Sequence, residues 1–376
     1  MGPSIAVSLL ASGAVGTPDA LRVAIVGYGI AGSVFHAPLV AATPGLRVAT
    51  VVTRDAARAA AAAGAYPGVR IVSDPDELFA APGGTDLVVV AAPNSAHVLL
   101  ARRAVAAGLP VVVDKPFATT AADAAAVARE AQAAGVLVTV FQNRRYDDDY
   151  RTLRAVLDGG TLGGVVRVES RFDRYRPTVQ EGRWRESGDP ALGGGLLLDL
   201  GAHLVDQAVT LFGAPEAVYA EVDRVRPGAA VDDDVFVALR YPDGPRVHLW
   251  ATMTARAPGP RFRVAGVGGT FEVRGLDPQE AALRAGRRPG DPGWGMDPSG
   301  RTGTLSADVG GVAVSAAVEL LPGAYETFYA GVRDAVRDGA PPPVDPWDAV
   351  LGLRVIEAAR RSAAEHRVAV LSAHEE

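Results

Sequence analysis

The apolar positions in the first half of the chain form short runs with almost no polar interruption, and stretches of helical character separate them. These runs lie at residues 21–26, 46–52, 69–72, 87–91, 111–113 and 136–141. Strands without polar alternation are typical of a parallel sheet that helices cover on both faces. The pattern predicts an α/β domain over residues 21–142, with its ligand at the carboxyl ends of the strands.

The second half has a different pattern, in which strands follow one another through turns such as Tyr241-Pro242-Asp243-Gly244. The predicted strands lie at residues 165–173, 217–225, 235–241, 247–254 and 262–267. Hairpin connections predict a large, mainly antiparallel open sheet, so we expect an α+β domain over residues 143–376. Helices are expected at residues 324–337 and 347–365. Residues 276–302, rich in glycine, proline and arginine, are predicted to form a long surface loop.

A glycine motif follows the first predicted strand and opens a predicted helix. It reads Gly27-Tyr28-Gly29-Ile30-Ala31-Gly32, a G-x-G-x-x-G sequence. Such glycines permit a tight turn and let the backbone approach a pyrophosphate at the helix N-terminus. In this context the loop indicates dinucleotide binding through Gly27, Gly29, Ile30, Ala31 and Gly32. A methyltransferase would share the fold and a related loop, so the loop alone leaves the cofactor class open.

The end of the second strand bears on the choice between NAD and NADP. An NAD site normally has Asp or Glu about 20 residues beyond the glycines, where it binds the ribose 2′-hydroxyl. This chain has Thr53 and Arg54 there, followed by Asp55. Arg54 offers a planar cation to a 2′-phosphate and Thr53 a hydroxyl donor, whereas Asp55 suits the N-cap of the next helix. We therefore predict NADP in preference to NAD.

Lys115 is the only lysine of the chain, beside 36 arginines. A composition that favours arginine wherever charge alone matters would keep lysine where a compact, titratable ammonium is needed. Chance is the alternative explanation. Asp114-Lys115-Pro116 follows the strand at residues 111–113, which places Lys115 at the carboxyl edge of the sheet. Lys115 is therefore a candidate for contact with cofactor and substrate.

A second set of ionisable side chains follows three glycines at residues 193–195. On a helix Asp199, His203 and Asp206 stand at i, i+4 and i+7 and share one face. A carboxylate beside an imidazole orients the ring and raises its basicity, as in a general acid–base pair. We expect Asp206, a turn further on, to support the pair without touching the ligand. A metal site, for which no further His or Cys ligand is evident, and an ordinary buried histidine remain as alternatives.

Composition and charge exclude several classes of protein and partner. The 376 residues are 48% hydrophobic and 21% charged, with a net charge of −6 and no cysteine. These values exclude a disulfide scaffold and a cysteine nucleophile, and they make nucleic acid an unexpected partner. No stretch approaches the roughly 18 apolar residues of a membrane span. Residues 1–20 lack a basic segment before their apolar run, so we expect a disordered leader or a misassigned start, and a cytoplasmic protein.

Together these motifs resemble the Gfo/Idh/MocA oxidoreductases, the family of glucose–fructose oxidoreductase and inositol dehydrogenase. The resemblance covers almost the whole chain from residue 21. It rests on residues 27–32, Pro93-Asn94-Ser95-Ala96-His97, Asp114-Lys115-Pro116 and residues 193–206. Residues 32–38 and 143–147 look most like the branch of NADP-dependent scyllo-inositol dehydrogenases. The family usually has Glu at the position of Asp114; the change keeps the charge and also occurs in that branch.

The resemblance implies a Rossmann domain followed by an α/β domain whose open sheet often mediates assembly, here into a homodimer or homotetramer. It implies hydride transfer between nicotinamide C4 and a secondary alcohol of a sugar or cyclitol. Lys115 would hydrogen-bond the reacting oxygen, His203 would exchange its proton, and Asp199 would position the substrate or the histidine. The expected ribose-lining residues are Pro93, Asn94 and His97, and the expected substrate residues are Asn143, Arg144, Arg174 and Trp184.

Two other functions stay open. One is a non-catalytic regulator that senses NADP, which would tend to lose Lys115 or His203. The other is a reductase of a biosynthetic keto-sugar or imine on the same scaffold, for which the hydride step is the same.

Overall fold

The computed structural model describes residues 20–180, 186–189 and 192–371. The expected leader lies outside this range except for Ala20, and so does the predicted substrate residue Trp184. None of the described helices is long and apolar enough to cross a membrane.

The first half is built on a six-stranded parallel sheet with the order β3-β2-β1-β4-β5-β6. Its strands are β1 (Leu21–Val26), β2 (Leu46–Val52), β3 (Arg70–Val72), β4 (Leu87–Val90), β5 (Val111–Asp114) and β6 (Val138–Phe141). The helical segments are η1 (Ala31–His36), α1 (Ala37–Ala42), α2 (Ala56–Ala65), α3 (Pro75–Ala80), α4 (Asn94–Ala106) and α5 (Ala121–Ala134). Strands β4 to β6 are buried almost throughout, as their uninterrupted apolar runs require. The predicted Rossmann arrangement is confirmed.

The second half is built on a nine-stranded sheet with the order β14-β13-β12-β11-β7-β10-β9-β8-β15. Its strands are β7 (Val165–Asp173), β8 (Ala217–Asp223), β9 (Asp234–Arg240), β10 (Arg246–Thr252), β11 (Phe262–Gly266), β12 (Gly269–Val273), β13 (Thr302–Val309), β14 (Val312–Glu319) and β15 (Ala369–Val370). Strands β7 and β10 run parallel to each other, and the other neighbours in this sheet are antiparallel. The prediction of a mainly antiparallel sheet is confirmed.

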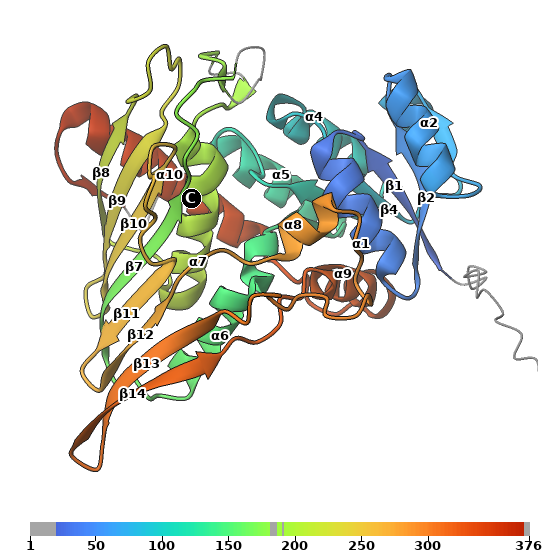
Figure 1. The fold of residues 1–376 in the computed structure, drawn as a ribbon. Coiled ribbons are helices and arrows are strands. Elements are labelled where there is room, and N and C mark those ends of the chain that lie inside the picture. The colour runs from blue at the N-terminus through green and yellow to red at the C-terminus, as the bar shows by residue number, and fades with distance from the viewer. Residues whose placement is uncertain (1–19, 181–185, 190–191, 372–376) are drawn as a thin grey trace, which may run out of the picture.

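Helices of the second half lie between its sheet and the Rossmann domain (Figure 1). They include α7 (Ala202–Phe212), which packs on β7 and β10, and α10 (Pro346–Glu365), which packs on α5, α7 and β8. The remaining segments are η2 (Asn143–Tyr146), α6 (Asp148–Asp158), η5 (Leu197–Gly201), α8 (Gln279–Arg284) and α9 (Glu326–Asp338). The opposite face of the large sheet carries Phe236 and Trp250, whose ring centres are 5.2 Å apart.

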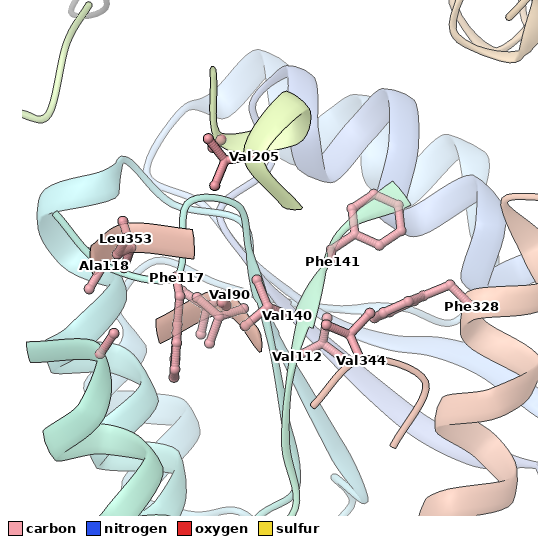
Figure 2. Packing of buried hydrophobic residues seen from close by; sticks show 14 of the residues in the cluster. Val90, Val112, Phe117, Ala118, Val140, Phe141, Val205, Phe328, Val344 and Leu353 are labelled. Carbon is pink, nitrogen blue, oxygen red and sulfur yellow. The ribbon is translucent and has the colours of Figure 1, made fainter. Parts of the chain in front are cut away.

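The two halves share one hydrophobic core. Phe141, at the end of β6, lies with its ring centre 5.0 Å from that of Phe328 on α9 (Figure 2). Thr139 of β6 also donates a hydrogen bond of 2.7 Å to the carbonyl oxygen of Val344, just before α10. The late helices therefore fix the second sheet against the Rossmann domain, and buried contacts determine how the two halves pack together.

The structure differs from the prediction between residues 269 and 319. The stretch predicted as a loop contains α8, and the strands β12, β13 and β14 were not predicted. Strands β13 and β14 form an edge hairpin of mainly small side chains, and β14 is exposed along nearly its whole length. Residues 302–309 alternate polar and apolar positions and residues 312–318 are mainly Val and Ala, but these side chains are small and mostly exposed, so they were not recognised as strands.

Candidate active site

The glycine loop borders a solvent-open cleft of about 1910 Å³ at the carboxyl ends of β1 and β2. Gly27 has φ +97°, and a Cβ there would lie 2.6 Å from the carbonyl oxygen of Ala91; a Cβ on Gly32 would lie 2.1 Å from the carbonyl oxygen of Gly27. Gly29 is different, because the nearest atom to its Cβ position is Arg58 Nη1 at 3.9 Å. Two glycines serve the turn, and the third leaves a bare backbone surface that fits a pyrophosphate group.

Both Thr53 and Arg54 line the same cleft, as does Arg58 on the first turn of α2. Arg54 donates a hydrogen bond of 3.1 Å to Asp74, and its side chain is 79% exposed. Asp55 accepts a hydrogen bond from the backbone N–H of Arg58 and so caps α2, the role expected for it. Arg58 was not anticipated from the sequence, although its place in the first turn after β2 directs it toward a ligand at the strand ends.

The turn after β4 contributes Pro93 and Asn94 to the cleft wall. Asn94 Nδ2 donates a hydrogen bond of 3.2 Å to the carbonyl oxygen of Gly193, which joins this turn to the second half. His97 lies behind the wall and is 1% exposed; its ring nitrogens lie 2.8 Å from Pro116 O and 2.9 Å from Ala92 O. The structure thus places His97 against the segment that carries Lys115.

Lys115 and Asp199 form an ion pair between the two halves. Lys115 follows β5, and Asp199 lies in the π-helical turn η5. The Nζ atom donates to Asp199 Oδ1 and to the Asp199 carbonyl oxygen, both at 2.8 Å. Charge-assisted contacts of this length hold the ammonium in one position.

His203, on the first turn of α7, is 4% exposed. Within the described part of the chain its Nδ1 has no hydrogen-bond partner. Burial lowers the pKa of His203 well below its ordinary value, and the positive charges of Lys115, Arg144 and Arg174 lower it further. The imidazole is therefore neutral at neutral pH and can accept a proton.

Lys115, Asp199 and His203 line one pocket of about 860 Å³. The predicted substrate residues Asn143, Arg144 and Arg174 line the same pocket. Ile30, Ala31 and Asp114 line both this pocket and the glycine cleft, so the two spaces adjoin there. That arrangement suits a cofactor in the cleft that reacts with a separate substrate in the pocket.

Asp206 lies outside this pocket, as expected for a residue that does not touch the ligand, but it contacts Arg145 and does not share the face of Asp199 and His203. Arg145 donates hydrogen bonds of 2.8 and 2.6 Å to its two carboxylate oxygens. The reason is the π-helical turn at Leu197–Gly201, whose wider winding changes the helical face between Asp199 and Asp206. Among the described residues no group of His, Asp or Glu side chains is arranged to hold a metal ion.

Helix α8 brings Glu280 and Arg284 into the pocket, and neither residue was predicted from the sequence to lie there. Glu280 accepts hydrogen bonds from Arg144 at 2.5 Å and from Arg284 at 2.9 and 3.1 Å. Burial opposes its ionisation, but Arg144, Arg174 and Arg284 lower the pKa of Glu280 to about 2. The i, i+4 spacing of Glu280 and Arg284 was the available signal for a helix here.

Asp114 holds the backbone that presents Lys115. Its Oδ1 accepts a hydrogen bond of 2.9 Å from the Lys115 N–H and lies 3.6 Å from His36 Nε2. The other ring nitrogen of His36 lies 2.5 Å from Tyr329 Oη on α9. Burial would raise the pKa of Asp114, but its contact with His36 and the charge of Lys115 bring it below the ordinary value.

The fold and site define an oxidoreductase with an NAD-binding Rossmann domain. A family model described as "Oxidoreductase family, NAD-binding Rossmann fold" matches residues 21–142, and its companion "Oxidoreductase family, C-terminal alpha/beta domain" matches residues 154–371. The chain belongs to this family, the Gfo/Idh/MocA oxidoreductases.

Individual relatives match over almost their whole length. The uncharacterized oxidoreductase YdgJ of Escherichia coli (strain K12) is 41% identical over 93% of this chain and 98% of its own. The scyllo-inositol 2-dehydrogenase (NADP(+)) IolW of Bacillus subtilis (strain 168) is 34% identical over 94% of this chain and 96% of its own. The solved structure of protein YPO2259 from Yersinia pestis, 41% identical, superposes with a TM-score of 0.88 over 96% of this chain and 99% of that one.

Proposed function

We propose that the protein transfers hydride between NADP and a secondary alcohol or ketone of a sugar or cyclitol. The observation that carries this proposal is the Lys115–Asp199 pair beside the neutral, buried imidazole of His203, in a pocket that adjoins the glycine cleft. A protein that only sensed its cofactor would need the cleft but not this pair and base. The name of the relative IolW, a scyllo-inositol 2-dehydrogenase that uses NADP, supports the substrate class.

Each residue has a definite task in this reaction. Lys115 Nζ uses two donors on Asp199 and keeps a third N–H for the reacting oxygen. His203 accepts the hydroxyl proton during oxidation and returns it during reduction. Asp199 neutralises and fixes the ammonium, and Asn143 and Arg144, which line the pocket, would bind other groups of the substrate. When bound, the nicotinamide ring supplies or takes up the hydride.

The adenosine end of the cleft supports NADP. Arg54 and Arg58 both line it, and Thr53 adds a hydroxyl group. A guanidinium matches a phosphate in shape and charge. Asp74, which also lines the cleft, already accepts hydrogen bonds from Arg54 and from the backbone N–H of Asp76. This leaves the cationic groups as the main recognition elements for a 2′-phosphate.

A screen of inositols, aldoses and keto-sugars with NADP and NADPH tests the proposal. Turnover of at least one secondary alcohol or its ketone is expected, and His203→Gln should remove it while NADPH still binds. Absence of any NADP- or NAD-linked turnover across the panel, with the cofactor bound, would favour the regulator instead.

The proposal includes assembly of the chain in the cytoplasm through the open face of the large sheet. Tyr219, Phe236, His248 and Trp250 form a row of ring contacts there, and the Arg171 guanidinium lies 4.0 Å above the Trp250 ring. A contiguous aromatic face of this kind is typical of an interface. Light scattering is expected to give a homodimer or homotetramer, and a monomer for Trp250→Glu.

A further inference from the structure

The charges in the substrate pocket do not balance. Its lining contains five cationic side chains and three carboxylates. The cationic residues are Lys115, Arg144, Arg174, Arg176 and Arg284, and the acidic ones are Asp114, Asp199 and Glu280. A neutral polyol needs hydroxyl partners and does not need an excess of positive charge.

The side-chain contacts in the pocket show which charges are compensated. Lys115 pairs with Asp199 at 2.8 Å, and Arg144 and Arg284 pair with Glu280 at 2.5 and 2.9 Å. Asp114 faces His36 Nε2 at 3.6 Å and bonds the backbone of Lys115. All three pocket carboxylates are therefore engaged, and the remaining positive charges are those of Arg174 and Arg176.

Arg174 and Arg176 follow β7 on one segment that runs along the pocket. Their backbones are fixed by hydrogen bonds to Thr252 O and Met253 O, at 2.9 and 2.7 Å. Neither guanidinium forms a hydrogen bond or a salt bridge to any residue in the described part of the chain. Burial lowers the pKa of Arg174, Arg144 and Arg176 lower it further, and Glu280 and Asp199 act against this.

A partly buried guanidinium without a partner is unfavourable, because it has lost water and gained no anion. Arg174 is such a group, and Arg176 lies two residues further along the same segment with an exposed side chain. Beside the reacting residues the two guanidinium groups offer paired N–H donors, which bind a carboxylate or phosphate. Substrate hydroxyl groups would satisfy some of these donors but would leave both charges uncompensated.

We propose that the physiological substrate is an acidic polyhydroxy compound whose carboxylate or phosphate binds Arg174 and Arg176, while Lys115 and His203 meet its reacting hydroxyl. This inference rests on the proposed function and narrows its substrate class from neutral sugars and cyclitols to their acids or phosphate esters.

The test compares matched ligands on the NADPH-loaded protein by titration calorimetry, so it needs no turnover. Two sets of ligands are used: D-glucose, D-glucuronate and D-glucose 6-phosphate, and myo-inositol with myo-inositol 1-phosphate. In at least one set the anionic member should bind at least about tenfold more tightly than the neutral member. The carboxylate and phosphate arms show which anion is preferred.

Arg174→Gln and Arg176→Gln should each bring that ratio toward one. Arg256→Gln is the matched control, because Arg256 is exposed, stacks on Tyr175 at 4.1 Å and does not line the pocket. It removes the same charge close by and should leave the ratio unchanged.

Three results are distinguishable. Anionic ligands that bind no better than their neutral partners in both sets, or a ratio that survives Arg174→Gln and Arg176→Gln, would overturn this inference even if a neutral polyol is turned over. Selective anion binding that depends on both arginines supports it. If that binding occurs but no NADP-linked turnover of any bound ligand follows, the proposed function fails and the anion site stands.

Discussion

Replacing Gly32 and Gly29 by alanine, one at a time, separates what the glycine loop does for the fold from what it does for the cofactor. A Cβ on Gly32 would lie 2.1 Å from the carbonyl oxygen of Gly27 and 3.4 Å from Ile25 Cγ2. Gly27 has little room to retreat, because it packs closely against the backbone of Ala91. Overpacking costs about 1–3 kcal/mol or more, so Gly32→Ala should lower the free energy of unfolding by at least that amount, even without cofactor.

The Gly29→Ala variant should behave in the opposite way. Its new Cβ meets nothing closer than Arg58 Nη1 at 3.9 Å, so the stability of the free protein should stay within about 0.5 kcal/mol. Gly29 lines the cleft, however, and a methyl group there would crowd a pyrophosphate at the backbone. A steric cost of about 1–3 kcal/mol corresponds to a rise in the Kd of NADPH of roughly 5- to 150-fold.

Two measurements on each variant separate the effect on stability from the effect on cofactor binding. Urea unfolding without nucleotide gives the stability, and a fluorescence titration with NADPH gives the Kd. If Gly29→Ala binds NADPH as tightly as the parent, the loop is not the pyrophosphate site. If Gly32→Ala unfolds at the same urea concentration as the parent, the close backbone contact is not rigid and the steric reasoning is wrong.

Three further predictions concern the reaction and the cofactor. Lys115→Arg should fold and bind NADPH but lose at least about a hundredfold in turnover; near-full activity on the identified substrate would contradict the role of Lys115. Because the pKa of His203 is lowered, the kcat/KM for oxidation should fall only below pH about 6.5, and reduction should speed up as the pH falls; a pH–rate profile with an acid limb above that value would refute the assignment. Arg54→Ala should reduce the preference for NADP over NAD by about 1.5–3 kcal/mol, measured as a ratio of kcat/KM. Arg58→Ala is measured beside it, and an unchanged ratio in both would exclude a guanidinium contact with the 2′-phosphate.

The strands of the first half were predicted well because each is marked in the sequence by an apolar run. Strands β1, β2, β4 and β5 are mostly buried on both faces, so each is a largely apolar run that ends close to a turn. In the second sheet β7 was predicted with its observed bounds, because buried and exposed residues alternate along it.

The prediction failed where the residue pattern does not indicate which positions are buried. The hairpin of β13 and β14 has small, mostly exposed side chains, and α8 has only six residues. The pairing of Asp206 with Arg145 also escaped prediction, since a π-helical turn cannot be inferred from spacing alone. For the site, motifs identified Lys115, Asp199 and His203, which line one pocket. Glu280 was missed because it comes from a segment predicted to be a surface loop.

The motif residues fall into two groups that the sequence cannot separate but burial can. Gly29, Lys115 and Asp199 line the cleft or the pocket, so a ligand can touch them. His97 and His36 are 1% and 0% exposed, and their contacts run to the backbone beside Lys115 and to the carboxylate of Asp114. Both histidines thus act on the position of Lys115.

The second half of the chain is needed for the proposed chemistry because it supplies two of the three reacting side chains. The Rossmann strands bring Lys115 to the sheet edge, but its ammonium is fixed by Asp199 of the second half, and the proposed base His203 also belongs to the second half. Asp199 lies in η5 and His203 on the first turn of α7, which directly follows it. The shared core and the Asn94–Gly193 hydrogen bond hold this segment against the first half. The reacting groups therefore meet only when the two halves pack together. For this reason a substitution in the interface, far from the ligand, is expected to change turnover before it changes cofactor binding.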